Sequence, residues 1–172
     1  MNEVPLFSSL NIKSITFRNR IVLSPMCQYK AKDGMISDWH LQHYSRFAFS
    51  GLGAAFVEAT GVTPEGRIGH GCTGIWSDDH IEGLSKISKT FKEYNCVSGI
   101  QLAHAGRKAS FLRPWDGASP ITKDDKVEPA WQTIGPSAIP INENSPVPRE
   151  MSLEDINNVK QAFKAAAQRA DK

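Results

Sequence analysis

The chain has 172 residues, a length that predicts one domain or part of one. Apolar residues make up 40% and charged residues 22%, as in ordinary soluble globular proteins. The formal net charge is only +2 and basic residues do not cluster, which argues against nucleic-acid binding. A run of about 18 apolar residues, the minimum for a membrane span, is also missing from the sequence.

The cysteines and the first residues bear on the cell compartment. Met1 to Pro5 lacks the basic and apolar regions of a signal peptide. Cys27, Cys72 and Cys96 are odd in number and far apart, which favours reduced thiols over a disulfide framework. We therefore expect a cytoplasmic protein.

The first part of the chain predicts a hairpin, a strand and a helix. Residues 1–19 are interpreted as a short β-hairpin with apolar Ile12, Ile15 and Phe17. A buried strand over 20–24 follows and ends at Pro25, which has no N–H to donate. Ser37 and Asp38 are suited to cap a helix that ends at Gly51 and Gly53, with an apolar face of Leu41, Tyr44, Phe47 and Ala48.

Two further strands and two helices are predicted downstream. The strands cover 54–60 and 97–103. Between them, Ser77 begins a helix that stops at Asn95, with the face Ile81, Leu84, Ile87, Phe91 and Tyr94. Residues 105–150 hold seven of the ten prolines and predict a long irregular excursion. Ser152 and Asp155 form a capping box for a last helix, with the face Ile156, Val159, Phe163, Ala166 and Ala170.

The alternation of strands and helices predicts an α/β fold with a parallel sheet. Polar side chains gather after each strand, namely Cys27, Tyr29, Thr60, Gln101 and His104. Both β/α barrels and doubly wound sheets bind ligands at these strand ends, so the pattern leaves the two architectures open. The first strand is not followed by Gly-x-Gly-x-x-Gly, which weighs against a dinucleotide-binding domain. A full barrel needs about 250 residues, so either the fold is smaller than a barrel or the chain is a fragment.

An ordered set of stretches is similar to the old yellow enzyme family of flavin-dependent ene-reductases. The stretches are Leu6-Phe7, Arg18-Asn19-Arg20-Ile21-Val22, Ser24-Pro25-Met26-Cys27-Gln28-Tyr29, Val57-Glu58-Ala59, Gly66-Arg67, Ile75-Trp76-Ser77-Asp78, Ile100-Gln101-Leu102-Ala103-His104-Ala105-Gly106-Arg107-Lys108 and Pro136-Ser137-Ala138-Ile139-Pro140. Cys27, where yeast-type members carry Thr, indicates the bacterial, thermophilic-like branch.

The resemblance implies a fold and an activity. It implies a partial (β/α)8 TIM barrel, with about the first three β/α units, an N-terminal hairpin and a long excursion after the third strand. Residues 1–172 would then be the N-terminal part of one FMN-binding domain. The family reaction passes hydride from NAD(P)H through flavin N5 to an electron-poor alkene, such as an α,β-unsaturated carbonyl or nitro compound. Full-length relatives are expected to be homo-oligomers.

The resemblance also implies site residues. Ser24, Pro25 and Met26 correspond to backbone that lies against the flavin ring and ribityl chain. Cys27 corresponds to a thiol near the reactive nitrogen, where a weak S–H donor tunes the flavin potential. Ala59 matches a backbone contact to the flavin, and Gln101 matches an amide on the pyrimidine edge, which can donate and accept at once. Tyr29 matches a phenol of the substrate pocket, and the resemblance assigns this chain no catalytic residue and no metal ligand.

Other interpretations of these residues remain open in the sequence. Cys27 can be an inert buried thiol, Gln101 can satisfy a buried strand end, and Tyr29 can be a surface aromatic. His40 and His43 are spaced as on one helix face but lack an evident third metal ligand. The role of His104, including a nucleophile–base pair with Cys27, is not assigned.

The sequence departs from the family where it stops, at Asp171-Lys172. In the family, later strands carry the paired ligands that hold the substrate and the groups that bind the flavin phosphate. The alternative hypothesis is therefore a truncated, non-catalytic fragment or an assembly partner.

Overall fold

The computed structural model describes residues 4–123, 125 and 128–172. Residues 1–3, which belong to the segment tested for a signal peptide, lie outside the described residues. Residues 124, 126 and 127 of the predicted excursion also lie outside them.

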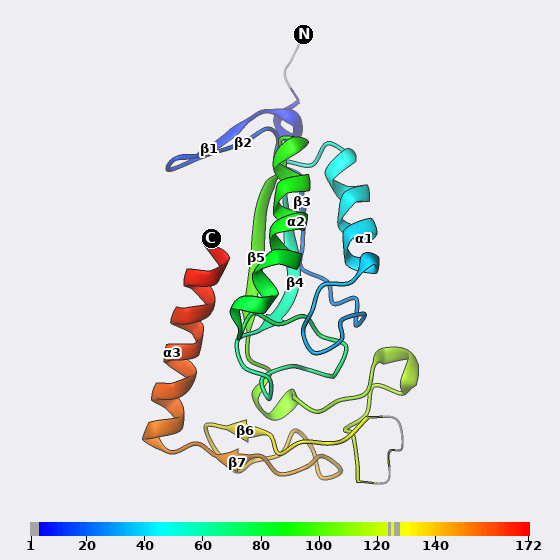
Figure 1. Cartoon of the computed structure of the whole chain (residues 1–172), viewed down its shortest axis with the longest axis vertical. Coiled ribbons are helices and arrows are strands. Elements are labelled where there is room, and N and C mark those ends of the chain that lie inside the picture. The colour runs from blue at the N-terminus through cyan, green and yellow to red at the C-terminus, as the bar shows by residue number, and fades with distance from the viewer. Residues whose placement is uncertain (1–3, 124, 126–127) are drawn as a thin grey trace.

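A three-stranded parallel sheet forms the centre of the fold (Figure 1). Its order is β3 (Val22–Leu23), β4 (Ala54–Gly61) and β5 (Val97–Ala103), which makes β4 the middle strand. Each of these strands is a short apolar run, and a helix returns the chain to the start of the next one. Such crossovers produce parallel pairing, so the predicted β/α alternation is confirmed.

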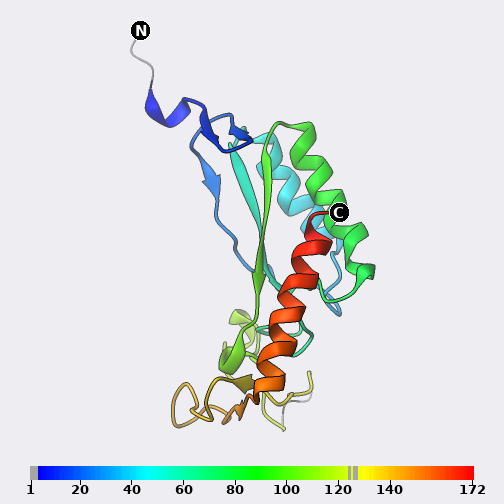
Figure 2. The same ribbon diagram turned by 90° about the vertical axis from the view of Figure 1, so that its left-hand side faces the viewer.

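The helices α1 (Asp38–Phe49), α2 (Ile81–Glu93) and α3 (Leu153–Ala170) lie on the same side of the sheet (Figure 2). Alternate β4 side chains, Ala55 and Val57, face α1 and α2 and are buried. The main core adds Tyr44, Ala48, Ile87, Phe91 and Cys96. A smaller core below α3 contains Val62, Ile75 and Ala166.

The opposite face of the sheet carries exposed apolar side chains in the described part of the chain. Val22 is 49% exposed and Phe56 is 37% exposed, although both are large apolar side chains. The prediction of a buried strand over 20–24 is therefore wrong in two respects, since β3 has only two residues and Val22 is open. The physical reason is that β3 is an edge strand, so one face and one side of it have no neighbour among the described residues.

The two ends of the sheet are occupied by different structures. The hairpin of β1 (Leu10–Ile12) and β2 (Ile15–Phe17) pairs antiparallel beside the start of the strands, as predicted. The excursion lies at the carboxyl ends of the strands (Figure 1). It contains one short parallel pair, β6 (Ile134–Gly135) with β7 (Arg149–Glu150), and 3₁₀ turns over Gly106–Lys108 and Pro114–Asp116.

The helix boundaries follow the predicted caps. Ser152 Oγ accepts the Asp155 N–H at 3.1 Å, and the Asp155 carboxylate accepts the Ser152 N–H at 2.8 Å. Two predicted apolar helix faces extend too far. Tyr94, predicted on the face of the helix after Ser77, follows the end of α2 and packs on Phe49 at the surface. Ala170, predicted on the face of the last helix, is exposed. Periodicity alone does not show where the neighbouring element stops, which is what decides burial at a helix end.

No helix among the described residues combines the length and the apolar character needed to cross a membrane.

Gly53 provides a test of the contact that starts β4. Its N–H donates to the Ile21 carbonyl at 2.9 Å, and an added Cβ would overlap the backbone carbonyl oxygen of Asn19. We expect Gly53→Ala to lower the free energy of unfolding by about 1–3 kcal/mol, because the overlap is with backbone and not with a side chain that can rotate. Urea denaturation followed by circular dichroism measures this.

Gly135→Ala is the matched control, because its added Cβ would meet other atoms only at 3.5 Å or beyond. We expect its midpoint to stay within about 0.5 kcal/mol of the parent. Equal midpoints for the two variants would contradict the packing described at Gly53.

Candidate functional site

Three of the predicted site residues meet at the carboxyl ends of the strands. Ala59 of β4 is the register partner of Gln101 of β5, after a small irregularity between Val57 and Ala59. The backbone N–H of Ala59 also hydrogen-bonds the sulfur of Cys27, from the segment that follows β3. Cys27, Ala59 and Gln101 therefore form one continuous wall across the three strands.

Ser24, Pro25 and Met26 extend this wall, which presents both polar and apolar atoms. Ser24 and Gln101 are exposed, Pro25 and Ala59 are half-buried, and Met26 is 46% exposed. A planar heteroaromatic ring needs an apolar surface along one side and an amide on its polar edge. The residues present fit one side of such a ring, since Met26 and Pro25 supply the apolar surface and Gln101 supplies the amide.

A buried carboxyl holds the segment that carries Cys27. Glu58 is fully buried, and its Oε2 accepts the backbone N–H of Gln28 at 2.8 Å. The backbone N–H of Tyr29 lies near the same carboxyl. Tyr44 of α1 accepts the Glu58 N–H at 2.9 Å and donates to Oε1 at 3.4 Å. Together these bonds tie the segment after β3 to the middle strand and to α1.

Burial controls the protonation of this cluster. Removal from water raises the pKa of Glu58 to about 7, partly opposed by the backbone N–H donors. Burial also lowers the pKa of His40 to about 4. The Nδ1 of His40 accepts the Ser37 N–H at 3.0 Å, so its proton lies on Nε2, 3.5 Å from Glu58 Oε1. That distance is too long for a strong hydrogen bond, and we interpret His40 as a neutral neighbour and not as a paired cation.

Tyr29 lies in a strained and crowded position. Its φ is 53°, in the left-handed region, and its ring makes an edge contact with Trp115 at 6.0 Å between centroids. Arg113 Nε donates to its carbonyl at 3.3 Å. Burial, together with the nearby Cys27 thiol, raises the pKa of its phenol to about 12. The alternative of a free surface aromatic is thus excluded, whereas its predicted contact with a substrate stays a prediction.

Sequence reasoning missed Cys72, which contacts Cys27 through its thiol. The two cysteines are far apart in the chain and no local pattern links them. Sequence reasoning also missed the role of Glu58, although the residue lies in a stretch that carries the family resemblance.

Other polar residues of the strand ends have structural partners. Thr60 is buried and donates to the Glu58 carbonyl at 2.8 Å, so it does not open onto the site. His104 Nδ1 accepts the Gly106 N–H at 3.1 Å, and no hydrogen bond joins His104 to Cys27 in the described residues. His43 packs edge-on against Tyr44 and Phe47. Within the described ranges, no three or more His, Cys, Asp or Glu residues form a group that could hold a metal ion.

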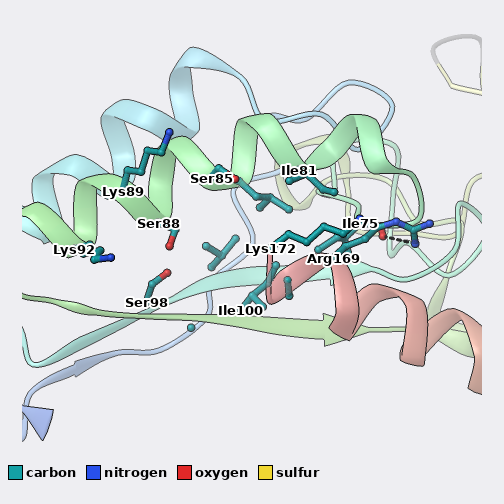
Figure 3. A pocket seen from close by; sticks show the side chains of 14 residues that line it. Ile75, Ile81, Ser85, Ser88, Lys89, Lys92, Ser98, Ile100, Arg169 and Lys172 are labelled. Atoms are coloured by element: carbon teal, nitrogen blue, oxygen red, sulfur yellow. Dashed lines mark hydrogen bonds between the residues drawn. The ribbon is translucent and has the colours of Figure 1, made fainter. Parts of the chain in front are cut away.

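A separate cavity of about 300 Å³ lies on the helix side of the sheet, between α2 and α3 (Figure 3). Ile75 and Ile100 contribute apolar surface, and Lys89 and Lys92 line it from α2. Arg169, which also lines the cavity, donates from Nε to Asp78 at 2.7 Å, so this cation is already paired. None of Cys27, Ala59 and Gln101 lines this cavity. The cavity is therefore separate from the candidate site, which is the wall at the strand ends.

Comparison with known proteins decides the family. Residues 5–172 match the NADH:flavin oxidoreductase / NADH oxidase family. The chain belongs to this family.

Curated members of the family are close in sequence. The NADPH dehydrogenase of Geobacillus thermodenitrificans is 46% identical over 174 residues, covering 100% of this chain and 46% of that relative. The NADPH dehydrogenase of Bacillus subtilis is 43% identical, covering 96% of this chain and 44% of that relative. The chain thus spans about half the length of the curated relatives it matches.

Solved structures confirm the predicted fold. Morphinone reductase in complex with tetrahydroNAD superposes with a TM-score of 0.79 at 22% identity, covering 98% of this chain and 47% of that one. Old yellow enzyme from Pichia sp. AKU4542 gives 0.77 at 23% identity, covering 96% and 42%. These neighbours are TIM barrels, so the α/β chain is a partial (β/α)8 barrel. Membership of this flavin oxidoreductase family implies FMN as cofactor, and the curated relatives are named NADPH dehydrogenases.

The raised pKa of Glu58 predicts a pH dependence of stability. Between about pH 4.5 and pH 7 the folded protein keeps a proton on Glu58 that the unfolded chain releases. Glu58 therefore makes the free energy of unfolding fall as the pH rises through this window. Glu58→Gln removes this titration, so the stability difference between parent and variant should shrink from pH 4.5 to pH 7, as measured by urea denaturation at several pH values.

At pH 4.5 we expect Glu58→Gln to cost about 1–3 kcal/mol, because its amide places a donor against the His40 N–H. Glu82→Gln, at a side chain 82% exposed on α2, is the control and should change stability by at most about 0.5 kcal/mol. A parent–variant difference that is constant over the whole pH range would contradict the raised pKa.

Proposed function

We propose that the chain is the N-terminal portion of an FMN-dependent oxidoreductase of the ene-reductase type. The observation that carries this proposal is the alignment of Cys27, Ala59 and Gln101 across three neighbouring strand ends. When bound, FMN would supply the transfer of hydride from NAD(P)H, through its N5, to an electron-poor alkene such as an unsaturated ketone or nitroalkene.

Each residue of the wall has a distinct task in this proposal. Gln101 offers a donor and an acceptor from one exposed amide, which suits the alternating polar atoms of a pyrimidine edge. Ser24, Pro25 and Met26 form the surface against the ring and ribityl chain. Cys27 lies beside the Ala59 N–H, and its sulfur next to the ring can tune the redox potential of the cofactor.

Tyr29 would contact the substrate at the rim of this wall. Its side chain lies near Cys27, and the ring is flanked by Trp115. An aromatic group beside the thiol can exclude water from one side of the reacting alkene and orient it. The identity of the alkene, the homo-oligomeric state and the cytoplasmic location remain predictions.

The face of the sheet with exposed apolar side chains supports an alternative for this chain on its own. Val22 and Phe56 leave apolar surface open, and the residues described form one side of a ring-binding site. We propose that further β/α units must cover this face and provide the phosphate-binding and substrate-holding groups. Alone, the chain would then be a non-catalytic module or an assembly partner.

A chimera separates these possibilities. Residues 1–172 would be joined to the remaining part of the Geobacillus thermodenitrificans relative, which is 46% identical over this portion. We expect the chimera to purify with FMN and to be bleached by NADPH under anaerobic conditions, and an unsaturated ketone to restore the oxidised spectrum. The chain alone should bind much less FMN. A folded chimera that takes up no flavin would overturn the proposed function.

Gln101→Leu in the chimera tests the predicted amide contact. Loss of a hydrogen-bonded polar partner typically costs about 1–3 kcal/mol, so the Kd for FMN should rise by about 5-fold to 150-fold. Gln42→Leu, an exposed glutamine on α1, is the matched control and should leave the Kd unchanged. Flavin fluorescence quenching measures both, and equal affinities would remove Gln101 from the proposed site.

A further inference from the structure

Two cysteines far apart in the sequence meet beside the end of β4. The thiols of Cys27 and Cys72 lie close enough to influence each other's ionisation, and both cysteines are free. The backbones around them are joined independently, because the Ala31 N–H donates to the Gly71 carbonyl at 2.9 Å. Gly71 also packs so closely on Tyr29 that an added Cβ would overlap its carbonyl oxygen.

The same strand residue fixes both cysteine segments. The N–H of Ala59 hydrogen-bonds the Cys27 sulfur, while Thr73, next to Cys72, donates to the Ala59 carbonyl at 3.4 Å. Thr73 also hydrogen-bonds Thr60 at 3.0 Å. The two thiols are thus held together by the rigid end of the middle strand.

The surroundings favour a pair that shares one proton. The other ionisable groups near the thiols are Tyr29, Tyr44, the Arg67 guanidinium and the buried carboxyl of Glu58. The Cys27 side chain lowers the pKa of Cys72, and the Cys72 side chain together with burial raises the pKa of Cys27. One thiolate is therefore stabilised in the pair, and a thiolate is the form of cysteine that reacts with peroxides.

We propose that Cys27 and Cys72 are a redox-active dithiol that hydrogen peroxide converts into a disulfide. Cys72 is only 2% exposed, whereas Cys27 is half-buried and gives the pair its access to a small oxidant. The inference goes beyond the proposed function and does not depend on FMN.

The reaction balances with hydrogen peroxide as the oxidant. Cys27, the thiol that peroxide can reach, gives its proton to the Cys72 thiolate and attacks one peroxide oxygen; the O–O bond breaks, and the departing hydroxide takes up a proton to form water. The other thiol then attacks the sulfenic sulfur, and the S–O bond breaks to release a second water. In sum, two thiols are oxidised and one peroxide is reduced, giving one disulfide and two waters.

The full 172-residue chain tests this without any flavin. The reduced protein would be treated with hydrogen peroxide, alkylated, and digested for mass spectrometry. We expect a Cys27–Cys72 crosslinked peptide, reversed by dithiothreitol, with Cys96 alkylated in the same sample. The same oxidation in concentrated urea should instead give crosslinks among all three cysteines.

Two variants distinguish a specific pair from general oxidation. Cys72→Ser should form no intramolecular disulfide, and its oxidation should stop at a sulfenic acid on Cys27 that dimedone traps. Cys96→Ser changes another buried cysteine and should keep the Cys27–Cys72 crosslink at the parent yield. The proposal is overturned if the parent keeps three free thiols, or if its native crosslinks match the mixture found in urea. Because no readout uses flavin, failure here is distinct from failure of the proposed function.

Discussion

The hydrogen bond that the Glu58 carboxyl accepts from the backbone after β3 determines how the wall is built. The pairing of β3 with β4 covers only Val22 and Leu23, and Pro25 has no N–H with which to extend it. Beyond that point the Glu58 carboxyl replaces the missing strand partner and binds the backbone of Gln28, with the backbone N–H of Tyr29 nearby. This buried side chain therefore anchors the segment that carries Cys27 and Tyr29, to which Arg113 and Gly71 add further contacts.

A carboxyl is well suited to this task, but it is expensive to bury. Its two oxygens can accept several N–H and O–H donors at once, which no apolar side chain could do. The cost of desolvation is reduced because Tyr44 donates to it and because protonation becomes easier as its pKa rises to about 7. The neighbouring His40 is kept neutral by its own burial, so the cluster avoids two isolated charges in the core.

The fold was largely predictable from local patterns, whereas the contacts of the site were not. The strand over 97–103 and the helix that starts after Ser152 agree with β5 and α3, because continuous apolar runs and a capping box are local signals. The exposure of Val22 and Tyr94 depends on which neighbours are present, and sequence periodicity carries no information about that.

The site shows the same division. The positions of Cys27, Ala59 and Gln101 at the strand ends came from the family resemblance, and the strand register then brought them together. The contact of Cys27 with Cys72 and the anchoring by Glu58 join segments about 30 to 45 residues apart. Such pairs are set by tertiary packing and have no signature in a single sequence.

The most direct test of the flavin wall is hydrogen–deuterium exchange of the chimera with and without FMN. The account predicts that FMN slows exchange in peptides covering Ser24 to Tyr29, the end of β4 and Gln101, while the β1–β2 hairpin at the other end of the sheet is unchanged. Protection confined to other segments, with these peptides exchanging at the same rate in the FMN-saturated and flavin-free forms, would contradict it.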